Sequence, residues 1–107
     1  MAIGEHEDRS LALHQAAVAL MQADDAVRLR ALEILRRWLV DIDENVRPVM
    51  VQWLPILENR DWDKALSQDQ EGDQRRHASP CSCILPTDQR LAILAACRQR
   101  ARELGRA

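Results

Sequence analysis

His77, Cys81, Cys83 and Cys97 have the side chains that most often bind zinc in proteins, and four is the number that a structural zinc site uses. The Cys-x-Cys spacing of Cys81 and Cys83 is tighter than the paired spacing of the usual zinc knuckle. Cys97 lies on an apolar helical stripe, where a cysteine behaves as a small hydrophobe. We therefore predict buried thiols and no bound metal, and a small zinc protein organised around His77, Cys81 and Cys83 is kept as an alternative.

His14 is the histidine whose position could suit acid–base chemistry, but it falls in the middle of the apolar face of a predicted helix. A general base needs a partner that orients it, and no local neighbour supplies one. The pattern favours a core histidine whose ring donates to a carbonyl. The carboxylate pairs Asp24–Asp25 and Asp61–Asp63 each begin a predicted helix, so capping explains them without chemistry. An enzyme organised around His14 or the cysteines is kept as an alternative hypothesis.

Phosphate-binding loops are excluded by composition, because the chain has only three glycines and they are isolated from one another. The sequence also has no Gly-x-Ser-x-Gly and no His-Glu-x-x-His pattern. We therefore expect a protein without catalytic activity and without a cofactor.

The net charge of −2 hides an uneven distribution. Residues 1–89 carry 10 basic and 16 acidic side chains, whereas residues 90–107 carry five arginines and one glutamate. Arg98, Arg100 and Arg102 suit the negative end of a last helix. As an alternative, Arg90 and these three arginines could contact the phosphates of a nucleic acid, although positions 98, 100 and 102 do not share one helical face.

The three tryptophans differ in their surroundings. Trp38 and Trp53 lie on apolar helical stripes and are predicted to be core residues. Trp62 lies between two aspartates, so it either packs over the mouth of the core or anchors a partner. Trp62 and His14 are our candidate partner-binding residues.

Apolar residues recur with helical spacing along most of the chain, and capping residues bound the segments. The predicted helices cover residues 10–22, residues 25–40 after Asp24 or Asp25, residues 46–59 with a kink at Pro55, a short segment after Asp61, and residues 87–104 with Thr87 as cap and Gly105 left-handed. Residues 67–76 have no apolar side chain and predict a solvated helix or an exposed loop. Residues 77–86 predict an irregular, partly buried connection.

The absence of Phe and Tyr and the scarcity of Gly argue against a sheet. We predict an all-α, compact single-domain bundle of about five helices, with a flexible N-terminus over residues 1–8 and one helical domain over residues 9–107. No run approaches the roughly twenty apolar residues of a membrane helix. The odd cysteine count and the lack of a signal-type segment predict a cytoplasmic protein with reduced thiols.

Four short motifs carry a family resemblance. They are L-x-x-H at residues 11–14, R-R-W at residues 36–38, W-x-x-[IL]-L at residues 53–57, and an [RH]-x-S-P element with a hydrophobic stretch at residues 77–85. With them the chain resembles a group of short helical bacterial proteins that are often the small member of two-gene modules of toxin–antitoxin type. The resemblance implies a non-catalytic protein that acts through a protein partner, such as an antitoxin.

The sequence thus leaves three functional hypotheses. The first is a protein-binding module or homo-oligomer that neutralises or scaffolds a partner. The second is a nucleic-acid-binding regulator that uses the basic C-terminal helix. The third is the small zinc protein or enzyme.

Overall fold

The computed structural model describes residues 5–105, and over that range the chain is helical with no strand. The elements are α1 (Glu5–Ala23), α2 (Asp25–Val40), α3 (Arg47–Met50), α4 (Trp53–Asn59), α5 (Trp62–Ala65), α6 (Gln70–His77), the 3-10 turn η1 (Cys81–Ile84) and α7 (Thr87–Gly105). The all-α prediction is confirmed. In this part of the chain no helix is long and apolar enough to cross a membrane.

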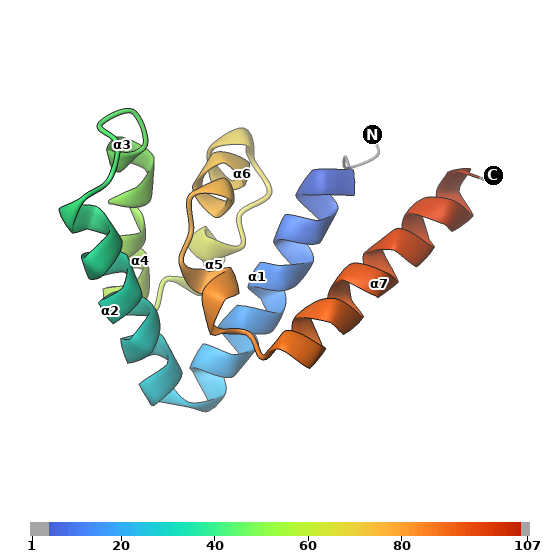
Figure 1. Ribbon diagram of the computed structural model, residues 1–107, viewed down its shortest axis with the longest axis horizontal. Coiled ribbons are helices and arrows are strands. Elements are labelled where there is room, and N and C mark those ends of the chain that lie inside the picture. Colours follow the sequence, from blue (N-terminus) through green and yellow to red (C-terminus); the bar gives the residue numbers. More distant parts are fainter. Residues whose placement is uncertain (1–4, 106–107) are drawn as a thin grey trace.

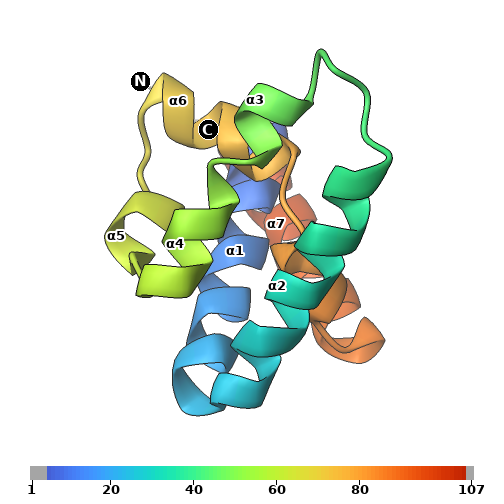
Figure 2. The ribbon, with the colours of Figure 1, turned by 90° about the vertical axis from the view of Figure 1, so that its left-hand side faces the viewer.

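Helix α1 is the central element of the molecule (Figure 1). It packs against α2 on one side and α7 on the other, and it also contacts α6 and η1. Helix α4 lies alongside α2, and the short helices α5 and α6 follow it (Figure 2). Asp24 ends the turn between α1 and α2, where its side chain accepts from the Ala26 N–H at 3.0 Å. Of the two aspartates predicted as caps, Asp24 therefore has that role.

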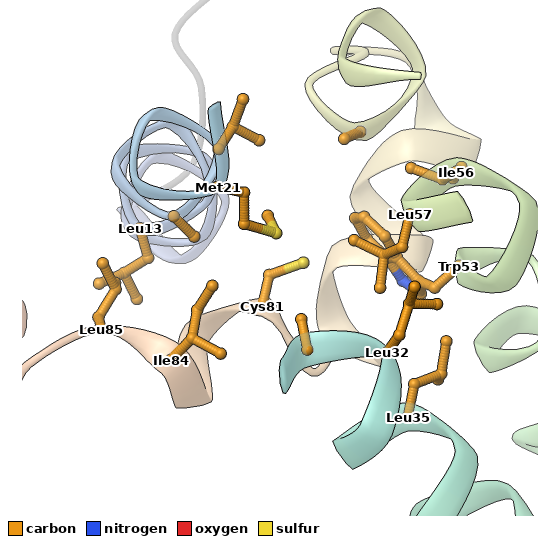
Figure 3. Close-up of a cluster of buried hydrophobic side chains, with 14 of the residues drawn as sticks. Leu13, Met21, Leu32, Leu35, Trp53, Ile56, Leu57, Cys81, Ile84 and Leu85 are labelled. Carbon is orange, nitrogen blue, oxygen red and sulfur yellow. The ribbon is translucent and has the colours of Figure 1, made fainter. Parts of the chain in front are cut away.

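The core brings together side chains from α1, α2, α4 and the segment around η1 (Figure 3). Trp53 is its largest member and is fully buried, and its indole Nε1 donates to the Arg75 carbonyl at 2.7 Å. The predicted core position of Trp38 is wrong, because this side chain is 37% exposed. Trp38 lies in the last turn of α2, whereas Leu35, three residues earlier on the same apolar stripe, is fully buried.

The predicted single helix over residues 46–59 is also wrong, because it divides into α3 and α4. Pro55 has no N–H for the Val51 carbonyl, and the Leu54 N–H bonds to that carbonyl instead, at 3.1 Å. Pro55 is therefore the third residue of a new helix, where a backbone N–H would have no intrahelical acceptor. The proline separates two helices and does not kink one.

The chain ends also differ from expectation. Helix α1 begins at Glu5, inside the segment 1–8 that we expected to be flexible, and residues 1–4 and 106–107 lie outside the described residues. Thr87 is the first residue of α7 and Gly105 its last. No described glycine has a positive φ, so the expected left-handed Gly105 is not observed.

Candidate functional site

His14 lies on the buried face of α1, stacked on the Trp53 ring with 5.6 Å between ring centroids. Its Nδ1 donates to the Ser10 carbonyl at 2.7 Å, so Nε2 carries the lone pair. Burial lowers the pKa of His14 to about 4, and the ring is therefore neutral at pH 7. Nε2 is buried and has no hydrogen-bond partner within the described part of the chain. The side chain, 2% exposed, is a core histidine and presents no nitrogen to solvent as a general base would.

A shallow pocket of about 290 Å³ lies beside His14, between α1, α6 and α7. Its lining consists of Arg9, Ser10, Leu13, His14, Arg76, His77 and Leu94. The Nε2 of His14 and the Nε of Arg76 are both buried and have no hydrogen-bond partner within the described part of the chain, so neither atom is exposed to solvent in this pocket. The surface that lines the pocket is mainly apolar.

The cysteines and His77 do not form a metal site. Cys81 and Cys97 are buried, whereas Cys83 is exposed. Burial raises the pKa of the Cys81 thiol to about 11, so it is protonated at neutral pH and is a poor nucleophile. Among the described residues no three His, Cys, Asp or Glu side chains lie close enough to hold a metal ion.

The arginines proposed for phosphate binding are all exposed on α7. Arg98 and Arg102 lie one turn apart on the same side, whereas Arg100 points elsewhere and its Nη2 donates to the Cys97 sulfur at 3.1 Å. The four arginines therefore do not form one basic face.

Two buried arginines of α6 were missed by the sequence analysis. Arg76 donates through Nη1 to the Ser67 carbonyl at 2.6 Å and the Ala65 carbonyl at 3.3 Å, and its Nη2 binds Asp73. Arg75 reaches the Lys64 carbonyl at 3.4 Å. Both guanidinium groups thus donate to carbonyl oxygens at the end of α5 or in the turn that follows it. Residues 67–76 are therefore neither an exposed loop nor a fully solvated helix.

A second ionic group joins α2 to α4. Arg28 donates through Nε to Asp25 at 2.6 Å and through Nη1 to the Leu57 carbonyl at 3.1 Å. Arg60 adds a bond to the same carboxylate at 3.2 Å. The hydrogen bonds from Arg28 lower the pKa of Asp25 to about 2. Asp25 therefore has a structural partner, and Asp61 caps α5 by accepting from the Lys64 N–H at 3.3 Å.

Trp62 and Trp38 differ in their exposure to solvent. Trp62 is half-buried and packs against the core from α5, and Trp38 is the more exposed of the two. The exposed large apolar residues are Leu29, Trp38, Val40, Val46, Val51, Leu91 and Leu104. All lie on α2, α7 or next to the short helix α3.

Comparison with known proteins adds no relative: no family model, no curated protein and no solved structure matches this chain.

Proposed function

We propose that this chain is a non-catalytic module that binds a protein partner, and that it neutralises or scaffolds that partner as its resemblance to toxin–antitoxin-type proteins implies. The observation that carries the proposal is Trp38, a large aromatic side chain left 37% exposed on α2. Exposed tryptophans are enriched at the centres of protein interfaces. The state of two candidate catalytic groups supports the same proposal. His14 and Cys81 are both buried in their uncharged forms, so neither is placed to act as a general base or a nucleophile.

Trp38 takes the anchoring role in this proposal, with Trp62 as the second candidate. His14 is too deeply buried to touch a partner directly, so its contribution is to hold α1 against Trp53. Trp62 exposes part of its ring on α5 while the rest packs on the core. The two tryptophans lie on different helices, so substitutions separate their roles.

The test is coexpression with the products of the genes adjacent to its own, followed by copurification and affinity measurement. We expect one stable complex, which Trp38→Ala weakens at least about tenfold, because truncating an interface hot spot costs about 2 kcal/mol or more. Leu29→Ala is the matched control, since Leu29 is an exposed apolar residue on the opposite side of α2. If Trp62→Ala alone breaks the complex, the anchor lies on α5.

A nucleic-acid-binding regulator is the competing proposal, and the exposed Arg98 and Arg102 favour it. Charge reversal at both positions tests it. If the chain binds none of the neighbouring proteins and binds DNA or RNA in a salt-sensitive way that this reversal abolishes, the regulator replaces the protein-binding module.

A further inference from the structure

We propose that two copies of this chain pair through the outer face of α7, with the two helices antiparallel and crossing at Ala95. Helix α7 packs mainly against α1 (Figure 1), and its buried residue is Cys97. The opposite side is exposed along its whole length, and Leu91 on it is 59% exposed. This outer face consists of Asp88, Leu91, Ala92, Ala95, Gln99 and Arg102.

The charges of the outer face select a second copy as the occupant. Asp88 and Arg102 lie seven residues on either side of Ala95, which is two helical turns or about 10 Å. An antiparallel pair with its twofold axis at Ala95 therefore places Asp88 of each copy opposite Arg102 of the other. A parallel pair would oppose like charges. Within the described residues neither Asp88 nor Arg102 has an ion pair in its own chain.

The residues between these charges suit close helix packing. Ala95 of one copy faces Ala95 of the other across the twofold axis, and this small side chain lets the two helix backbones approach closely. Leu91 faces Gln99 of the second copy and covers its aliphatic stem. Opposed helix dipoles add to the attraction. A single pair of helices buries less than a standard interface, so the dimer is weak and depends on concentration.

Disulfide trapping tests the position of the axis. Cys83 is exposed, so the experiment uses a Cys83→Ser background, in which the remaining cysteines Cys81 and Cys97 are buried. Oxidation of Ala95→Cys is expected to give a covalent dimer, while the adjacent Ala96→Cys, a quarter-turn or more away, gives little. Equal trapping at the two positions, or none at Ala95→Cys, overturns the proposal.

Charge exchange tests the orientation. In sedimentation experiments from micromolar to millimolar protein, Asp88→Arg or Arg102→Asp alone is expected to weaken the dimer about tenfold, because each converts two attractive pairs into repulsive ones. The double variant, which carries both Asp88→Arg and Arg102→Asp, is expected to recover the affinity of the dimer. Arg30→Asp is the control, because Arg30 is exposed on α2 and lies outside the outer face of α7. A monomer at all concentrations, or a dimer unaffected by both single changes, refutes the pairing. Since Trp38 lies on α2, this result is independent of the proposed partner complex.

Discussion

The imidazole of His14 remains neutral at a pH where an exposed histidine takes up a proton, because burial opposes the charged form. The nearby positive charges of Arg76 and His77 act in the same direction. Its helical spacing predicted the buried position, since residue 14 falls among the apolar residues of α1. The Trp53 ring beneath it was not predictable, because that contact joins helices far apart in the sequence.

Acid should therefore destabilise the fold through His14. Above pH 6.5 both states are neutral at this residue, and between pH 6.5 and about 4 only the unfolded chain takes up the proton. The unfolding free energy is expected to fall by up to about 3 kcal/mol over this range. Urea titrations at several pH values check this, with His14→Asn as the comparison because its amide can still donate to Ser10. Asp25, whose pKa is lowered to about 2, contributes mainly below pH 3.8, and it is present in both proteins, so its contribution cancels in the comparison. Equal pH slopes for the two proteins would contradict the assignment.

Helix α6 is an element without apolar side chains of its own that nonetheless lies against the core. Hydrophobic periodicity could not predict this, because residues 67–76 bury two arginines and a glycine instead of leucines. The acceptors of the arginines are mainly carbonyls of the preceding turn and of α5, and these are invisible in a pattern of residue types. For α6, the sequence could predict only that a helix is possible and that its first turn is acidic.

Gly72 shows how closely α6 approaches the preceding turn. A Cβ at this position would overlap the Ser67 carbonyl oxygen and lie 3.0 Å from Asp69 Oδ1. The turn would have to move, which breaks the cap that Asp69 makes with the Gly72 N–H and displaces an acceptor of Arg76. We expect Gly72→Ala to cost roughly 1–3 kcal/mol in chemical unfolding.

Gly105 provides the matched control for that substitution. Nothing lies within 4 Å of a Cβ built there, and the residue is helical. Gly105→Ala is expected to be neutral or to stabilise by up to about 1 kcal/mol. Similar losses from the two alanines would show that α6 does not depend on a close approach at Gly72.

At the scale of the whole molecule, one core joins α1, α2, α4 and η1 (Figure 3), while α7 and the last turn of α2 keep large apolar side chains exposed. The helical class and most core positions follow from periodicity. The boundary of the core does not, since Trp38 and Leu35 occupy the same apolar arc of α2 and differ only in what lies against them. That depends on the packing of α4 and η1, which residue types do not encode locally.

The position of the core boundary on α2 predicts that Leu35→Ala and Trp38→Ala differ in how much stability they cost. Leu35 is fully buried, so Leu35→Ala leaves a cavity and is expected to cost about 2–5 kcal/mol. Trp38 is 37% exposed, and its removal lets water and neighbouring side chains fill the space, so Trp38→Ala is expected to cost only about 1 kcal/mol. Denaturant midpoints of the two variants measure the contrast directly. A loss at Trp38 as large as that at Leu35 would place this tryptophan in the core after all, and the partner surface would then have to be sought on α5 or α7.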